Sequence, residues 1–380
     1  MGRIIAFPTR RAAKALSFRQ FSTAAPPTSR NVPEQLRDAP QTIFSGIQPT
    51  GIAHLGNYLG ALSAWGRLCA RSPPSTRLIF SIVDLHALTV PPPADLLREY
   101  KRQCAAMIIA SGVDPKKCVL YVQSAVPAHA ELCWILTCMA EFGYLSRMTQ
   151  WKSKLNIADD ASTNNREAQK NLKLGLFAYP VLQAADILLY QTNLVPVGDD
   201  QVQHLELTRH IADRFNARHK VDVFRIPEVL LTPTPRIMSL KNPTKKMSKS
   251  DPTPATRIMI SDTTDQIAKK IRGAVTDSIT GITYEPVSRP GVANLIDIVA
   301  GILEQPQADV AEQYASMTHG EFKAAVTDVV CAEMAPVRRR FEELSADPEY
   351  IDLVLKKGAE KASEIAQITL DEVKKTIGLL

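Results

Sequence analysis

Residues 42–57 read TIFSGIQPTGIAHLGN, a stretch that combines a strand, a loop and the start of a helix. Thr42-Ile43-Phe44 has the β-branched and aromatic character of a short strand, and the loop that follows, Ser45 to Gly51, contains glycine and proline. A helix is predicted to begin near His54, because apolar residues recur after it at spacings of three and four. These apolar positions are Leu55, Tyr58, Leu59, Leu62, Trp65 and Cys69. Strand, loop and helix in this order begin an α/β unit.

The same alternation continues along the chain. Further strands are predicted at 78–85, 118–122 and 194–197, where short apolar runs occur. Helices are predicted at 93–112, 128–142, 181–190 and 199–219, and the chain beyond 292 is nearly all helical. We therefore expect an α/β protein with a doubly wound, Rossmann-like parallel-sheet catalytic domain and an α-helical C-terminal domain.

The chain has 380 residues, which is more than one typical domain. We expect a leader at 1–33, a Rossmann-like catalytic domain at 34–235, a loop at 236–256 and a helical region at 257–380. A polar insertion near 155–172 interrupts the periodicity of the catalytic domain. The stretch 232–256 is rich in proline, serine, threonine and lysine, which is typical of a loop.

The net charge of +6 comes from the leader alone. Residues 1–33 carry six arginine or lysine residues and no acidic residue, so the rest of the chain is neutral. This basic, acid-free composition with interleaved apolar residues predicts a mitochondrial transit peptide, with 19–22 as the cleavage region; the alternative is a disordered basic tail. We therefore expect the protein in the mitochondrial matrix, and any contact with nucleic acid must come from a local patch.

Composition excludes several other classes of protein. Hydrophobic residues make up 45% and charged residues 22% of the chain, which is ordinary for a globular protein. No apolar run approaches the roughly 20 residues that span a bilayer, so no membrane association is expected. The six cysteines form no CxxC and no zinc-finger spacing. Mostly buried free thiols, and no structural zinc, are therefore expected.

Two short motifs carry the candidate chemistry. His54-Leu55-Gly56-Asn57 lies where the first loop meets the helix, a position suited to phosphate, with His54 and Asn57 as hydrogen-bond donors. The alternative is that both residues only cap the helix. Lys246-Met247-Ser248-Lys249-Ser250 places two lysines on the later loop, where they suit the developing charge of a leaving polyphosphate. The alternative is a solvated basic loop.

Together the two motifs resemble the signatures of class I aminoacyl-tRNA synthetases. Four further blocks are similar to the bacterial and mitochondrial branch of the tryptophanyl-tRNA synthetase family: Phe44–Gly51, Tyr179–Leu188, Val195–Gln201 and Val275–Ser278. The resemblance implies that the protein activates L-tryptophan with ATP and Mg²⁺, releases pyrophosphate, and transfers tryptophan to tRNA(Trp). It also implies a homodimer.

The resemblance assigns roles to individual residues. It implies that His54, Asn57, Lys246 and Lys249 stabilise the transition state without transferring a proton. The residues that it places near ATP are Gln48, Pro49, Thr50, Gly56, Asn57, Gly198, Asp199, Asp200, Ile237, Lys246, Met247, Ser248, Lys249 and Ser250. Lys152 and Lys154 match a family stretch near the phosphates, and Asp199 stands where glutamate is common in the family.

Asp186 is the candidate for substrate specificity. A buried carboxylate can accept the indole N–H, and an analogue that lacks this group would leave the carboxylate unpaired. The alternative is an ion-paired core residue. The other residues implied at the tryptophan site are Phe44, His86, Tyr179, Gln183 and Gln201. Gln183 departs from the family, where bacterial relatives often have methionine.

Three other functions remain as alternatives. A tyrosyl-tRNA synthetase shares the fold and both signatures, but the block around Asp186 favours tryptophan. An inactive synthetase-like RNA-binding protein and a non-tRNA nucleotidyltransferase are less consistent with the intact motifs and the indole block. The cluster 338–340 of three arginines provides either a patch for tRNA or a solvated helix face.

Overall fold

The computed structural model describes residues 41–155, 166–196, 201–230 and 236–380. Several predictions lie outside the described residues: the leader with its cleavage region, most of the polar insertion, and Gly198, Asp199 and Asp200.

The centre of the fold is a sheet of five parallel strands. They are β1 (Thr42–Ile47), β2 (Arg77–Ile82), β3 (Val119–Val122), β4 (Leu194–Pro196) and β5 (Glu228–Leu230), in the spatial order β3-β2-β1-β4-β5. The order reverses between β1 and β4, which defines a doubly wound sheet and confirms the predicted fold class. Strand β5 was not predicted, because its three residues are too few to show a period.

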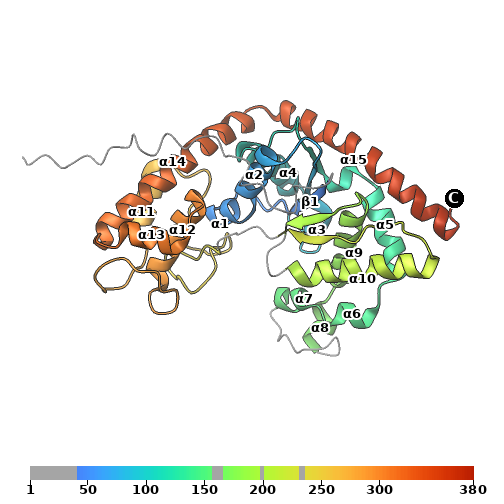
Figure 1. The fold of residues 1–380 in the computed structure, drawn as a ribbon, viewed down its shortest axis with the longest axis horizontal. Helices are drawn as coiled ribbons and strands as arrows, with labels where there is room; N and C mark the ends of the chain where they lie inside the picture. The colour runs from blue at the N-terminus through green and yellow to red at the C-terminus, as the bar shows by residue number, and fades with distance from the viewer. Residues whose placement is uncertain (1–40, 156–165, 197–200, 231–235) are drawn as a thin grey trace, which may run out of the picture.

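Helices connect the strands and cover both faces of the sheet (Figure 1). A continuous helical segment follows β1 and consists of α1 (Leu55–Asn57), a π-helical turn (Tyr58–Leu62) and α2 (Ser63–Arg71). The others before the C-terminal region are α3 (Asp84–Ala87), α4 (Ala94–Ala110), α5 (Ala128–Thr137), α6 (Phe142–Ser146), α7 (Thr149–Lys154), α8 (Arg166–Asn171), α9 (Leu174–Leu188) and α10 (Val202–His219), with a short 3₁₀ turn at Gln123–Ala125.

The C-terminal region is helical, as predicted, and extends from one end of the molecule to the other (Figure 1). A 3₁₀ turn at Pro254–Thr256 precedes α11 (Thr264–Arg272), α12 (Pro290–Leu303), α13 (Gln307–Tyr314), α14 (His319–Ser345) and α15 (Pro348–Ile377). Helices α11 and α12 pack against α14, α13 packs against α12, and α15 arches back over the sheet.

Alternate side chains of the strands pack into two separate apolar cores, one on each face of the sheet. Ile43 and Phe80 belong to the first core, which α2, α4, α12 and α14 complete. Phe44 and Tyr121 belong to the second, which α5, α9 and α10 complete. Both cores position the ends of β1 and β4 rigidly between the helical layers.

Helix α15 belongs to both cores because it crosses the edge of the sheet at β3. Leu355 packs in the first core and Ala359 in the second. Gly358 lies between them, and a Cβ atom there would stand 1.8 Å from the backbone oxygen of Leu120. Only glycine permits this approach, and the helix covers an edge strand that would otherwise expose its backbone.

Several predicted boundaries were wrong. The strand predicted at 78–85 ends at Ile82, because Asp84 begins α3 and accepts hydrogen bonds from the backbone N–H and the hydroxyl of Ser124. The helix predicted at 128–142 ends at Thr137, and Glu141 forms an ion pair with Arg214 of α10 before α6 begins. Both breaks depend on partners that are distant in the sequence.

The cysteines are less buried than the sequence predicted. All six cysteines are free thiols, but only Cys69, Cys104 and Cys118 are buried, and Cys138 is exposed, against the expectation that most are buried. Among the described residues, no helix has the length and apolar character needed to cross a bilayer.

Candidate active site

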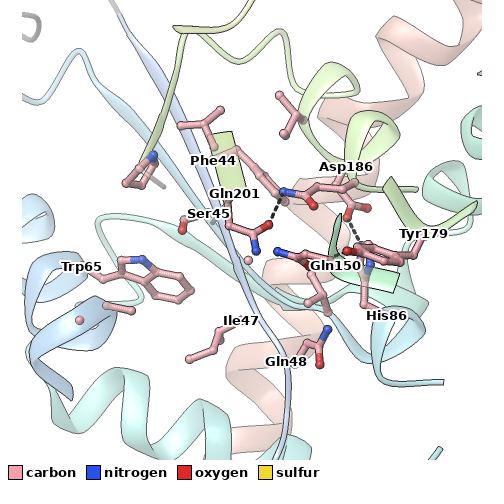
Figure 2. A pocket seen from close by; sticks show the side chains of 18 of the residues that line it. Phe44, Ser45, Ile47, Gln48, Trp65, His86, Gln150, Tyr179, Asp186 and Gln201 are labelled. Carbon is pink, nitrogen blue, oxygen red and sulfur yellow. Dashed lines mark hydrogen bonds and ion pairs between the residues drawn. The ribbon is translucent and has the colours of Figure 1, made fainter. Parts of the chain in front are cut away.

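A pocket lies at the carboxyl ends of β1 and β4, where the strand order reverses (Figure 2). Doubly wound sheets bind their ligands at this place. Residues of β1, the π-helical turn, α2, α7 and α9 line it, among them Gly60 and Trp65. All six residues implied at the tryptophan site line the pocket: Phe44, His86, Tyr179, Gln183, Asp186 and Gln201. Gln48, implied near ATP, lines it as well.

Asp186 is 1% exposed and accepts three hydrogen bonds. Nε2 of His86 lies 2.7 Å from Oδ2, whereas Nε2 of Gln123 and Nδ1 of His129 lie 2.7 Å and 2.6 Å from Oδ1. A carboxylate offers about four acceptor positions, two on each oxygen. One position on Oδ2 therefore remains for a donor that enters the pocket.

The carboxyl group of Asp186 is ionised. Burial alone raises its pKa, but the hydrogen bonds and charges of His129 and His86 outweigh burial and hold the pKa well below the ordinary value. An ionised carboxylate is only an acceptor, so the three neighbouring nitrogens are donors. This arrangement favours a ligand with an N–H and disfavours one that presents an apolar edge or an acceptor.

Further hydrogen bonds connect other polar residues that line the pocket. Nε2 of Gln183 donates to Oε1 of Gln201 over 3.3 Å, and the same oxygen lies 3.0 Å from Nδ1 of His204. The hydroxyl of Tyr179 donates to Gln150 and lies 3.1 Å from Nε2 of His204. Gln183 is thus bonded to Gln201 and not to Asp186, although both face the pocket from α9.

His54 and Asn57 form a reciprocal cap at the start of α1. Nδ1 of His54 accepts from the backbone N–H of Asn57 over 3.2 Å, and Oδ1 of Asn57 accepts from the backbone N–H of His54 over 3.3 Å. The capping role therefore exists in the structure. It leaves Nε2 of His54 and Nδ2 of Asn57 outside these two bonds, so a further role as donors is compatible with capping.

His54 is neutral at physiological pH. Burial, and to a smaller extent the charges of Lys249, Lys246 and Arg257, together lower the pKa of this histidine to about 4. Because Nδ1 accepts from Asn57, the proton of the neutral ring is on Nε2. A neutral donor beside three cations is suited to an anionic ligand such as a triphosphate.

The second motif lies against the first. Nζ of Lys249 donates to the backbone oxygens of Gly51 and Thr50 over 2.8 Å and 3.2 Å, and to Oγ1 of Thr50 over 3.1 Å. Burial lowers the pKa of Lys249 to about 8. The two motifs that the sequence separates by about 190 residues thus meet at the loop after β1.

Backbone pairing holds the lysine loop in place. The N–H of buried Met247 donates to the oxygen of Ile237 over 3.1 Å, and Lys246 pairs with Met238. Ile237 is itself 2% exposed and lies against Gly56, where a Cβ atom would be 3.5 Å from that of Ile237. Ser248 and Ser250 share a hydrogen bond of 2.8 Å between their hydroxyls.

The segment after the lysine loop ties it to α1. The N–H of Leu55 donates to the oxygen of Ile258 over 2.7 Å, and His54 pairs with Met259. Arg257 precedes this segment, and its Nη1 donates to the oxygen of Asp251 over 2.7 Å. The C-terminal end of the lysine loop is therefore anchored to the first motif.

The other basic residues singled out in the sequence, Lys152, Lys154 and the arginines at 338–340, lie outside the two motifs. Lys154 lines the pocket, with its Nζ 5.0 Å from the centre of the Tyr179 ring, whereas Lys152 is 5% exposed beside Trp151. Arg338 donates to the backbone oxygen of Asp262, and Arg340 forms an ion pair with Glu343. These contacts within the chain favour the helix-face interpretation of the arginine cluster over an open patch.

Sequence reasoning missed three residues of this site: Gln123, His129 and Arg257. Gln123 follows directly after β3 and His129 lies in the first turn of the next helix, α5, and side chains after the carboxyl ends of parallel strands lie near the switch point. That position was the available signal for them. Arg257 lies seven residues beyond Ser250, outside the five-residue motif, and carried no signal of its own.

Comparisons with known proteins agree with this geometry. The family model described as tRNA synthetases class I (W and Y) matches residues 36–334. The mitochondrial tryptophan–tRNA ligase of Saccharomyces cerevisiae is 47% identical over 344 residues, which are 89% of this chain and 90% of the relative.

Two solved structures are also similar. The crystal structure of tryptophanyl-tRNA synthetase from Mycoplasma pneumoniae superimposes with a TM-score of 0.77 at 32% identity and covers 89% of this chain and 97% of that chain. The enzyme from Campylobacter jejuni complexed with ADP and tryptophan gives a TM-score of 0.71 at 31% identity and covers 89% of this chain and 100% of that chain.

The likeness extends over nearly the whole described chain, and it includes both motifs and the pocket at the switch point. This chain belongs to the class I tRNA synthetases of the tryptophan and tyrosine (W and Y) family.

Proposed function

We propose that this protein is a tryptophan–tRNA ligase, which activates L-tryptophan with ATP and then transfers tryptophan to tRNA(Trp). The observation that carries the proposal is Asp186: a buried, ionised carboxylate in the pocket with one acceptor position left on Oδ2. The indole N–H of tryptophan fits that position. The names of the similar proteins from S. cerevisiae and C. jejuni support the same substrate.

In the first step the carboxylate of tryptophan attacks the α-phosphorus of ATP in line. A bond forms between the carboxylate oxygen and phosphorus, and the bond to the bridging oxygen breaks, so that pyrophosphate leaves with the electron pair. No proton is transferred. The chain contributes positioning and charge: His54 and Asn57 as donors, and Lys246 and Lys249 as cations for the charge on the leaving pyrophosphate.

ATP would lie between the two motifs. Gln48, at the mouth of the pocket, leads directly into the loop on which Lys249 rests. We propose that the loop after β1, Gly56 and the lysine loop enclose the triphosphate, and that the backbone of Ile237 contacts adenine. We also propose that Gly198, Asp199 and Asp200, which lie outside the described residues, contact ATP.

Mg²⁺ would enter with the nucleotide. Phosphate oxygens are preferred ligands of Mg²⁺, which also retains several waters. Among the described residues, no group of three or more His, Cys, Asp or Glu side chains is arranged to hold a metal ion. Bound to the phosphates, the ion would neutralise part of their charge.

The remaining proposals concern organisation and place. We propose a leader at 1–33 that directs the protein to the mitochondrial matrix, a catalytic domain at 34–235, the lysine loop at 236–256, and a helical anticodon-binding region at 257–380. We also propose a homodimer, which sedimentation of the purified protein tests directly. The mitochondrial name of the S. cerevisiae relative supports the location.

Amino-acid-dependent exchange of pyrophosphate into ATP tests the proposed function. The purified protein should exchange pyrophosphate with tryptophan and not with tyrosine or any other standard amino acid. Asp186→Asn should weaken tryptophan binding because an amide presents both a donor and an acceptor to the indole edge. Exchange that depends on tyrosine, or no exchange with any amino acid, would overturn the proposal.

A further inference from the structure

His129 contacts Asp186 from behind the pocket. It is fully buried in the first turn of α5, and its Nδ1 lies 2.6 Å from Oδ1 of Asp186. Its other nitrogen, Nε2, lies 2.9 Å from the hydroxyls of both Tyr121 and Tyr190. None of these three residues lines the pocket, so each acts on a ligand only through Asp186.

The hydrogen-bond pattern fixes which atom of His129 carries a proton. Asp186 is ionised and accepts only, so Nδ1 must donate to it, whichever protonation state the ring has. The two hydroxyls hold Nε2 at the other side of the ring. Rotation of the ring would break these bonds and the bond to Asp186 inside the buried core, where unpaired polar groups are costly. The ring of His129 therefore has one favourable orientation.

Gln123, the other donor to Oδ1, is fixed as well. Gln123 is fully buried, and while its Nε2 donates to Oδ1, its Oε1 accepts from the backbone N–H of Leu85 over 3.1 Å. Oδ1 therefore has two protein donors and no position left. Oδ2 has His86 alone, so the remaining acceptor position is the one on Oδ2.

We propose that His129 is a specificity-determining positioning residue: by saturating Oδ1 together with Gln123, it leaves Oδ2 of Asp186 as the single acceptor for a ring N–H of the substrate. This inference rests on the proposed function. With His129 in place, a ligand that lacks the N–H leaves an ionised acceptor unpaired in the pocket. Without the Nδ1–H, the carboxylate turns or takes up a proton, and that penalty falls.

The structure offers a matched pair of variants. Asparagine carries its amide nitrogen at the δ position, as histidine carries Nδ1, so His129→Asn retains a donor for Oδ1. His129→Leu removes the donor at similar size. The readout is the ratio of kcat/KM for tryptophan to kcat/KM for 3-benzothienylalanine, in which sulfur replaces the ring N–H, measured by pyrophosphate exchange with the full chain.

The ratio should be about 10⁴ for the wild-type protein, because sites built around a hydrogen bond reject analogues that lack it. We expect His129→Leu to lower the ratio about tenfold or more, and His129→Asn to keep it within about threefold. The KM for ATP should not change in either variant. A general structural role would reduce kcat/KM for both substrates equally and leave the ratio unchanged, which would overturn the inference.

A double variant covers the case in which His129→Leu does not fold. Tyr121→Phe combined with Tyr190→Phe removes both hydroxyls from Nε2 and keeps the aromatic packing. The ratio should fall in this double variant as well, and a wild-type ratio would overturn the inference. Failure of the proposed function is distinguishable, since the wild-type protein would then show no tryptophan-dependent exchange at all. If Asp186→Asn abolishes the preference but the other variants do not, only the role of His129 is wrong.

Discussion

Nζ of Lys249 lies 2.8 Å from the backbone oxygen of Gly51, so the lysine of the second motif rests on the loop of the first. Its three acceptors in this position are uncharged oxygens of Thr50 and Gly51. A triphosphate is a stronger acceptor for the same ammonium group. We therefore expect the Lys249 side chain to leave these oxygens and bind the phosphates when ATP is present. The backbone hydrogen bond between Met247 and Ile237 would stay in place.

Lys249→Ala should lower the rate of tryptophan activation about 10²- to 10³-fold, because one donor to the developing charge of the transition state is lost. The Kd for tryptophan should stay near the wild-type value, since Lys249 does not line the pocket around Asp186. Single-turnover activation and tryptophan titration measure the two quantities. Lys116→Ala, at an exposed lysine before β3, is the control and should exchange pyrophosphate as the wild type does. Exchange at wild-type speed in Lys249→Ala would contradict the role.

The activity should decline at high pH because of the same lysine. Burial lowers the pKa of Lys249 to about 8, so the group loses its charge as the pH rises through that value. The kcat/KM for ATP reports the free enzyme and should fall above about pH 8. In Lys249→Arg the side chain stays charged, and this decline should disappear even if the overall rate is lower. An unchanged high-pH limb in that variant would assign the decline to another group.

The alternation of strands and helices was predictable because buried parallel strands leave compact apolar runs between amphipathic helices. The apolar run 78–85 is visible without any knowledge of the fold, although the strand itself ends at Ile82. Glu228–Leu230 is not, because three residues carry no period, and it becomes a strand only by pairing with β4. The end of α5 at Thr137 is equally invisible, since no glycine or proline marks it and the following turn depends on the ion pair between Glu141 and Arg214.

The pocket was predictable only in part, for a related reason. Phe44, Tyr179 and Asp186 belong to short blocks that resemble a known family, so their grouping follows from local sequence. His129 and Gln123 lie 57 and 63 residues from Asp186 in the chain. Their partnership is a property of the folded core, where the end of β3 meets α9, and no spacing in the sequence indicates it.

The burial of His54 should make the protein sensitive to acid. Its folded pKa of about 4 lies below the ordinary 6.5, so between these values the unfolded chain binds a proton that the folded chain does not. The stability is complete above pH 6.5 and is lost as the pH falls toward 4, by up to about 1.4 kcal/mol per pH unit from this residue. His54→Gln should flatten the curve in that window by the same amount.

Denaturant unfolding at several pH values measures this slope. The internal control is the range above about pH 7.5, where the slopes of the wild type and His54→Gln should coincide because the histidine is uncharged in both the folded and the unfolded chain. Parallel curves through the window from pH 6.5 to 4 would contradict the assignment of a neutral, buried His54.

Gly358→Ala should destabilise the protein by about 3 kcal/mol, since a Cβ atom would stand 1.8 Å from the backbone oxygen of Leu120 and helix α15 would have to move away from β3. The shift would loosen both cores, because α15 packs in each of them. Gly175→Ala on α9 is the matched control: nothing lies within 4 Å of its Cβ position, and the change should stabilise by about 0.5 kcal/mol. Denaturant unfolding compares the two variants. If the Gly358→Ala and Gly175→Ala proteins were equally stable, the close approach of α15 to β3 at Gly358 would not contribute to the stability of the fold.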